Sequence, residues 1–332
     1  MDKSLQGKVL TARGTVAPAA LGAVLMHEHL HSDLRTWEEK PIAPERMELL
    51  MGYAVPNLRK LHAYGCHAFC DCTMPPWRAW PDVYLKMSEA ADIHIIVATG
   101  FYREMEVGTY MVKTEADAIW PWVREAAVED LAEMCIREFE QGIHGTSVRP
   151  GCLKLGTSSK DLTPAELKTF RAAARAHKAT GLFITTHCTR PGAHVAQLEA
   201  LEKEGVDPHR VVIGHTASHL VNENPTVREC MRRGATFLPT NLRMDGDWEF
   251  IAALMKAIRQ LFEDGFGDRL VLGLDWAFET VQGPFVPCTF MPPPPYVYMF
   301  TYVLPRFRKL GLEEQAIAQM LVKNPARVLP VK

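Results

Sequence analysis

The stretch Leu25-Met26-His27-Glu28-His29-Leu30-His31 follows an apolar run and ends in alternating histidines. In a β-strand the side chains of residues i and i+2 point to the same face, so His27 and His29 would project together while Glu28 points away. Two imidazoles side by side at the end of a strand supply half of a metal site. Alternatively, both are solvated histidines near a turn, and the rest of the chain must decide between the two interpretations.

Short apolar runs alternate with helical stretches along almost the whole chain. Because each expected strand is followed by a helix, or by a loop and a helix, we expect parallel strands, and eight such units predict a closed (β/α)₈ barrel of α/β class. The expected strands cover residues 23–28, 67–72, 93–99, 152–155, 182–186, 211–214, 235–239 and 270–274. The expected helices cover residues 44–63, 81–91, 119–141, 163–180, 192–204, 224–232 and 248–263, and two more close the chain.

One helix start is especially well defined. In Thr163-Pro164-Ala165-Glu166, a threonine cap precedes a proline at the first helical position, and a glutamate stands three residues after the cap. This pattern predicts a capping box.

The composition is that of an ordinary globular protein. Of 332 residues, 47% are apolar and 23% are charged, and the formal net charge is −2. No internal repeat or low-complexity linker divides the chain, so residues 1–332 are expected to form a single domain. No run of Lys or Arg indicates a nucleic acid or an anionic membrane as partner.

Targeting signals are also missing from the sequence. No apolar segment reaches the ~18 residues that a membrane span needs, and the N-terminus lacks the apolar core of a signal peptide. The eight cysteines are scattered, apart from the group around Cys70 and Cys72. We interpret them as reduced thiols of a cytoplasmic protein rather than as a metal or redox site.

Six chemically active side chains each stand at the C-terminal end of an expected strand. In a barrel those ends converge on the face where active sites are built. Four histidines and an aspartate suit Zn, Mn, Co or Fe, and they are too many for one tetrahedral ion, which indicates two divalent metal ions with a water activated between them. The six residues are His27, His29, Lys154, His187, His215 and Asp275.

Lys154 is the unusual member of this set. A buried lysine beside two cations is unfavourable unless its charge is removed. From the residues alone it is either a neutral amine base or a displaced surface residue.

Five stretches spread along the chain can be compared with known families. They are LGAVLMHEHLHSD at 21–33, LKLGTS at 153–158, RAAARAHKATGLFITTH at 171–187, VVIGH at 211–215 and LGLDW at 272–276. In these stretches the chain resembles the phosphotriesterase family of the amidohydrolase superfamily, and the resemblance covers nearly its whole length.

The resemblance implies a ligand set for each metal. In that family the paired histidines and the aspartate of the last strand hold one ion, which implies His27, His29 and Asp275. The histidines of the fifth and sixth strands hold the second ion, which implies His187 and His215.

The resemblance also resolves the position of Lys154. The corresponding lysine of the family is carboxylated by CO₂ and bridges both metals, and such a carbamate is an anion, which removes the electrostatic objection. The implied reaction is attack by a metal-bridging hydroxide on a carbonyl or phosphoryl centre, with Asp275 carrying the proton to the leaving group.

Lactonase-type relatives imply substrate contacts as well. A tyrosine after the third strand and an arginine after the seventh shape their pocket, which implies Tyr102 and Arg243. The loop 279–295 is expected to cover the site as a lid, and together with Trp276 it indicates an apolar acyl or aromatic substrate group. Alternatively, Tyr102 and Arg243 are surface residues and the loop packs on a neighbouring element.

One stretch departs from the pattern of phosphotriester-hydrolysing members. They carry an Asp closely after the histidine of the sixth strand, whereas residues 214–219 read Gly-His-Thr-Ala-Ser-His, without a carboxylate. His219 could relay a proton instead, or it is simply solvated. The departure favours a lactone or a carboxylic ester as the small-molecule substrate.

Three alternatives stay open at this point. The first two are a phosphotriester hydrolase and an N-acyl amide hydrolase, which would use the same site. The third is a barrel that binds a small ligand without catalysing a reaction. The resemblance also implies a homodimer.

Overall fold

The strands form one parallel barrel sheet. The computed structural model describes residues 3–33, 40–75, 77–104, 120–240, 242, 248–281 and 296–332. Within them the sheet has the order β10-β3-β4-β5-β6-β7-β8-β9, and every neighbouring pair is parallel. Its strands are β3 (Ala23–Asp33), β4 (Cys66–Asp71), β5 (His94–Gly100), β6 (Cys152–Gly156), β7 (Phe183–His187), β8 (Val211–Gly214), β9 (Thr236–Leu238) and β10 (Ala277–Val281).

The segment 270–275 closes the sheet into a barrel. On one side the backbone N–H of Val271 donates to the carbonyl of Phe237 in β9 at 3.0 Å. On the other side the N–H of Asp275 donates to the carbonyl of His27 in β3 at 2.9 Å. The segment therefore fills the gap between β9 and β3, and the predicted (β/α)₈ barrel is confirmed.

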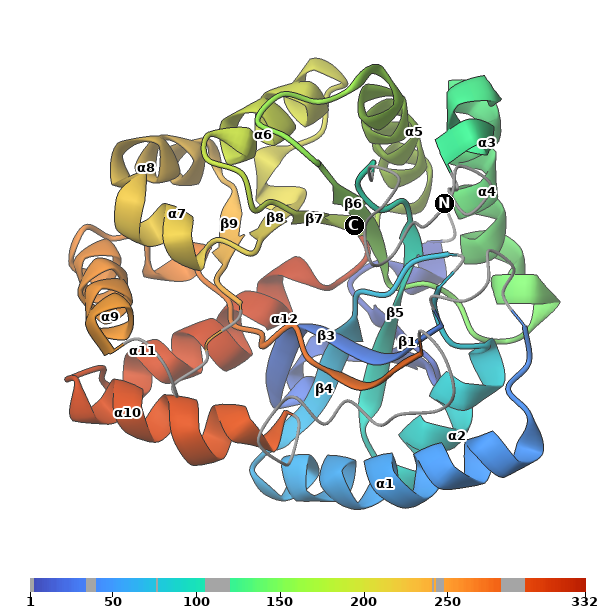
Figure 1. Cartoon of the computed structure of the whole chain (residues 1–332), viewed down its shortest axis with the longest axis horizontal. Coiled ribbons are helices and arrows are strands. Elements are labelled where there is room, and N and C mark those ends of the chain that lie inside the picture. Colours follow the sequence, from blue (N-terminus) through green and yellow to red (C-terminus); the bar gives the residue numbers. More distant parts are fainter. Residues whose placement is uncertain are drawn as a thin grey trace.

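The helices form an outer ring around the strands (Figure 1). They are α1 (Pro44–Ala63), α2 (Pro81–Ala91), α3 (Trp120–Glu125), α4 (Val128–Gln141), α5 (Pro164–Thr180), α6 (Ala193–Lys203), α7 (Ala217–Asn222), α8 (Asn224–Arg233), α9 (Trp248–Glu263), α10 (Leu304–Lys309), α11 (Glu314–Ala318) and α12 (Asn324–Val328). The segments η7 (Met299–Val303) and η8 (Gln319–Lys323) lead into α10 and α12.

Four elements differ from the sequence prediction. The segment expected as the last strand, 270–274, is not itself a strand, and the last strand of the sheet, β10, lies at Ala277–Val281, where a loop was expected. The helix expected over 119–141 is interrupted, because Ala127 adopts an extended backbone (φ −70°, ψ 156°) between α3 and α4. The six-residue α7 was not predicted, since it is too short to show a helical period. A hairpin of β1 (Val9–Thr11) and β2 (Gly14–Val16) was also missed; the N–H of Ala12 donates to Ile95 and so attaches the hairpin to the start of β5.

The predicted capping box of α5 is confirmed. The N–H of Glu166 donates to Thr163 Oγ1 at 3.1 Å, and the N–H of Thr163 donates to Glu166 Oε2 at 3.0 Å. Glu166 is fully buried and also accepts from the N–H of Ser158 at 2.7 Å. The cap therefore fixes the loop that follows β6, the strand that carries Lys154.

Two layers of apolar side chains hold the fold together. One layer fills the barrel, with members such as Val24, Met26 and Cys70, and the other lies between the strands and the surrounding helices. This alternation is the strand period of two, with each strand covered on both faces. The described cysteines are all free and buried, as expected for reduced thiols.

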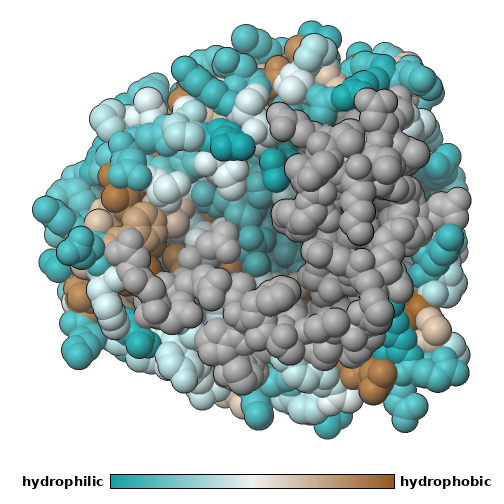
Figure 2. Space-filling model, viewed as in Figure 1, coloured by the Kyte–Doolittle hydropathy of each residue, from teal (hydrophilic) through white to brown (hydrophobic). Residues whose placement is uncertain are grey.

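The outer surface agrees with the composition. The described part of the face in Figure 2 is mainly hydrophilic, with hydrophobic residues in small groups. Among the helices that the structure describes, none combines the length and the apolar character needed to cross a membrane.

Gly100 gives a test of the barrel packing. Its φ is +116°, and an added Cβ would lie 2.2 Å from the carbonyl oxygen of Lys154. We expect Gly100→Ala to lower the free energy of unfolding by roughly 3 kcal/mol, because a left-handed backbone and a backbone clash add up. The measurement is urea denaturation.

Gly52 provides the matched control. It lies inside α1, and an added Cβ there meets nothing within 4 Å. Gly52→Ala should raise the free energy of unfolding by about 0.5–1 kcal/mol. Equal denaturation midpoints for the two variants would contradict the close approach of β5 and β6.

Candidate metal centre

A carboxylate lies among three histidines at the C-terminal ends of the barrel strands. Asp275 Oδ1 is 3.2 Å from His29 Nε2 and 3.4 Å from His27 Nε2. The other oxygen, Oδ2, is 3.5 Å from His215 Nδ1. Asp275 therefore connects β3, which carries His27 and His29, to His215 directly after β8.

The two remaining predicted side chains complete the group. Lys154 is 1% exposed, and its Nζ lies 3.3 Å from His27 Nε2. The ring centroid of His187 is 4.0 Å from that of His215. The structure thus brings all six strand-end side chains together, as the barrel topology predicts.

A β-bulge in β3 and two residues with positive φ angles set the directions of these side chains. Between Leu25 and Glu28 the register with β4 shifts by one residue, a β-bulge, so Met26 and His27 both contribute to the barrel interior. His215 and Asp275 have positive φ angles of 61° and 63°. Non-glycine residues rarely take this conformation, and strain of this kind is concentrated at functional sites.

Glu28 holds the backbone on both sides of Asp275. Its Oε1 accepts from the N–H of Leu274 at 2.7 Å, and its Oε2 accepts from the N–H of Trp276 at 3.2 Å. Glu28 points away from the histidines, as the strand period predicts, but its role as a backbone acceptor was not predicted. The available signal was an acidic residue inside an otherwise apolar strand.

Asp71, on the neighbouring strand β4, is a second carboxylate that accepts hydrogen bonds from backbone N–H groups. Its two oxygens accept from the N–H groups of Leu30 at 2.6 Å and Thr73 at 2.9 Å. Thr73 Oγ1 in turn lies 2.7 Å from His29 Nδ1, so it fixes the orientation of that imidazole. This support is a typical arrangement around metal-binding histidines.

Burial keeps the imidazoles neutral. It lowers the pKa of His27 and of His187 well below the ordinary value, and it lowers the pKa of His215 to about 4. Burial alone would raise the pKa of Asp275, but the nearby His215 and His29 outweigh it and lower that pKa. Neutral imidazoles beside a carboxylate are the donors that zinc and similar ions prefer.

One buried nitrogen atom supports a metal at this place. His215 Nε2 is buried and finds no hydrogen-bond partner among the described residues. One ligand atom each of His27, His29 and Asp275 lies within 4.8 Å of the others. The donor set therefore fits a divalent cation.

The predicted substrate residues are only partly placed. The hydroxyl of Tyr102 is 3.4 Å from His187 Nδ1, so Tyr102 does lie at the cluster. Trp276 is 1% exposed and packs against Tyr298, with ring centroids 4.6 Å apart. Arg243 and residues 282–295 of the expected lid lie outside the described residues, and Glu279 belongs to β10 rather than to a loop.

His219 does not point at the six residues. Its Nε2 lies 3.1 Å from the carbonyl oxygen of Arg190 and 3.8 Å from Cys188 Sγ. These contacts place it in a second cluster, described below.

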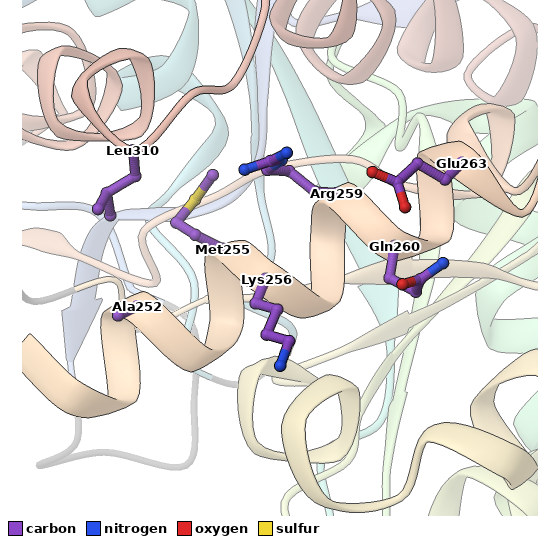
Figure 3. Close-up of a pocket in the computed structure, with 7 residues that line it drawn as sticks. All are labelled: Ala252, Met255, Lys256, Arg259, Gln260, Glu263 and Leu310. Atoms are coloured by element: carbon purple, nitrogen blue, oxygen red, sulfur yellow. The ribbon is translucent and has the colours of Figure 1, made fainter.

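A separate pocket lies on the outside of the barrel. It has a volume of about 440 Å³ and lies along α9, opposite Leu310 (Figure 3). Its lining includes Lys256 and Arg259, and none of the six strand-end residues. It is therefore not the candidate centre.

A parallel barrel with histidines, a carboxylate and a lysine at its strand ends defines a candidate metal-dependent hydrolase. The family model of the "Phosphotriesterase family" matches residues 7–329. The chain belongs to the phosphotriesterase family, and as a member it is a metal-dependent hydrolase.

Individual relatives agree with this membership. A "Phosphotriesterase homology protein" of Mycobacterium tuberculosis is 30% identical over 325 residues, which are 96% of each chain. The solved "Organophosphorus Hydrolase from Deinococcus radiodurans" is similar with a TM-score of 0.80 and 28% identity, and covers 98% of both chains. A mutant of a Deinococcus radiodurans "PTE-like lactonase" is 30% identical, with a TM-score of 0.76, and covers 97% of this chain and 99% of that one.

Glu28→Gln tests the support of Asp275. An amide presents an NH₂ group to one of two backbone N–H donors, so we expect a loss of about 1–3 kcal/mol in the free energy of unfolding. Metal content should fall as well, because Asp275 loses its fixed backbone. The control is Glu263→Gln, on the exposed surface of α9, which should change neither quantity. A Glu28→Gln protein with wild-type stability and metal content would refute this role.

The pKa of His215 predicts a pH dependence for the metal-free protein. In the unfolded chain the imidazole takes up a proton below its ordinary pKa of 6.5, but in the folded chain it does so only near 4. Stability should therefore be present above pH 6.5 and decline as the pH falls from 6.5 toward 4. Urea denaturation of chelator-treated protein across this range measures the decline. His215→Asn should lose less stability than the wild type over the same range; identical declines would show that burial does not hold His215 neutral.

Proposed function

We propose that this protein hydrolyses a lactone or a carboxylic ester with two divalent metal ions, zinc being favoured. The convergence of six donor side chains at one end of the barrel carries the proposal. His27, His29 and Asp275 would hold one ion. The other would be held by His187 and His215, with Lys154 between the two. When bound, the ions supply a nucleophile from water and polarise the substrate carbonyl.

Lys154 is suited to carboxylation. Burial lowers the pKa of this lysine, and only the neutral amine reacts with CO₂. The new N–C bond forms as the amine loses a proton to solvent, and the product is an anionic carbamate. Carboxylation would thus replace the buried ammonium cation of Lys154 by a carbamate anion, which two neighbouring metal ions stabilise. This accounts for a lysine at this position.

Asp275 is the group that we assign to proton transfer. Its Oδ2 faces His215 and its Oδ1 faces His29 and His27, so the carboxylate is held between the ligands of both ions. A proton taken up at the carboxylate can be passed to the leaving oxygen of an opened ester.

A carbonyl substrate is favoured by two observations. Residues 216–218 contain no carboxylate that could extend a proton relay beyond His215. The Tyr102 hydroxyl lies beside His187, where it can orient a carbonyl or ring oxygen. One solved relative is described as an organophosphorus hydrolase and another as a PTE-like lactonase, so phosphotriesters belong in the test, and so do N-acyl amides.

The experiment is acid release from a panel of substrates. Protein loaded with Zn, Mn or Co in the presence of bicarbonate is assayed on lactones, aryl esters, N-acyl amino compounds and an aryl phosphotriester. Preference for lactones or esters supports the proposal. Preference for the phosphotriester or the amide would keep the metal centre and replace the substrate class. No turnover on any class, with ligand binding retained, would favour a binding protein.

Asp275→Asn should reduce turnover of the preferred substrate by roughly 100-fold or more, because the amide cannot take up the proton. Asp161→Asn, at an exposed loop position, is the control and should keep wild-type turnover. Chelation should abolish turnover, and added zinc should restore it in the control but not in Asp275→Asn. A folded Asp275→Asn protein with wild-type turnover would refute the mechanism.

A further inference from the structure

A second cluster of side chains of metal-ligand type lies outside the six strand-end residues. His194 is the second residue of α6, His219 lies in α7, and Glu223 joins α7 to α8. His194 is 0% exposed and His219 is 1% exposed, whereas the Glu223 side chain is 22% exposed. One ligand atom from each of the three lies within 4.8 Å of the others.

Hydrogen bonds fix the tautomer of His194. Thr226 Oγ1 lies 2.9 Å from the carbonyl oxygen of Glu223, which can only accept, so we assign the hydroxyl proton to this bond and the acceptor role toward His194 to the hydroxyl oxygen. His194 Nε2 lies 2.9 Å from that oxygen and therefore carries the ring proton. His194 Nδ1 is left with a lone pair.

That lone pair faces an anion. His194 Nδ1 is buried, has no hydrogen-bond partner among the described residues, and lies 4.0 Å from Glu223 Oε2. A cation between them would satisfy the buried imidazole nitrogen and the partly exposed carboxylate together.

His219 completes the set. Its Nε2 lies 3.7 Å from Glu223 Oε1, and its Nδ1 is buried without a partner among the described residues. In tetrahedral zinc sites, with metal–ligand bonds of about 2.0–2.2 Å, neighbouring ligand atoms are about 3.3 Å apart. His194 Nδ1 and His219 Nε2 lie 4.0 Å and 3.7 Å from different oxygens of Glu223, so the carboxylate would have to turn and the ligand atoms move closer when an ion binds.

We propose that His194, His219 and Glu223 bind a further zinc ion, separate from the ions expected at the strand ends. Two imidazoles and a carboxylate, with a fourth position open to water beside the partly exposed Glu223, are a zinc donor set. When the ion binds, His219 gives up its Nε2 hydrogen bond to the Arg190 carbonyl and carries its proton on Nδ1 instead. No net proton is lost from either imidazole.

The position of the cluster indicates what the ion would do. α6 follows the strand that ends at His187, and α7 follows His215 by one residue. Glu223 already holds the start of α6, because its Oε2 accepts from the N–H of Gly192 at 2.6 Å. An ion here would tie together the two segments that carry the predicted ligands of the second strand-end metal.

The test counts zinc bound by the whole chain. Protein is saturated with zinc, separated from unbound metal by gel filtration and analysed by elemental mass spectrometry. Glu223→Gln and His219→Asn should each bind one equivalent less than the wild type. His209→Asn is the matched control: this exposed histidine pairs with Asp207 at 2.9 Å and has no third ligand among the described residues, so its variant should bind as much zinc as the wild type.

A second background separates this proposal from the hydrolase proposal. When His187 and Asp275 are both changed to Asn, the strand-end ions should be lost, and one equivalent of zinc should remain and raise Tm. Adding Glu223→Gln to that background should remove the last equivalent and the Tm rise. If the His187/Asp275 variant binds no zinc, or if folded Glu223→Gln binds as much zinc as the wild type, the second site does not exist. If Glu223→Gln loses zinc but the His187/Asp275 variant binds as much zinc as the wild type, the proposed strand-end centre is contradicted instead.

Discussion

The hydrogen bond from the Asp275 N–H to the His27 carbonyl joins the last barrel segment to the first strand, and the site depends on it. It closes the barrel at the level of the candidate metal-binding side chains, so the same contact that completes the fold also brings Asp275 to His27 and His29. Glu28 strengthens this junction by accepting the N–H groups on both sides of Asp275. The same backbone contacts therefore close the barrel and position Asp275.

The buried ionisable side chains around the candidate centre differ in their hydrogen-bond partners. Glu28 and Asp71 are carboxylates that the fold surrounds with backbone N–H groups, which satisfy both of their oxygens without any metal. Within the part of the chain that the structure describes, Lys154 has no such carboxylate or carbonyl acceptor at hydrogen-bond distance, and its Nζ faces the imidazole of His27. We therefore interpret Glu28 and Asp71 as structural carboxylates, and Lys154 as a residue of the proposed reaction.

Much of this arrangement could be predicted from the sequence. Alternating strands and helices give the barrel, and a barrel places every strand end on one face, so His187 and Asp275 could be brought together although they are far apart in the chain. The β3 bulge could not be predicted, because one extra residue leaves no mark in an apolar run. His194 and His219 could not be paired either, since both lie on helices whose relative placement depends on packing rather than on a periodic pattern. Arg243 was predicted from a resemblance alone, and it lies outside the described residues.

The pairing of β3 with β10 continues beyond the metal-binding residues, from His29 opposite Ala277 to Asp33 opposite Val281. At ~3.3 Å per residue, this ribbon rises about 13 Å above the histidine, as a wall on one side of the centre. The wall is held by backbone hydrogen bonds, so exchanging single side chains cannot lower it. Its height changes only when residues are inserted or deleted in both strands together.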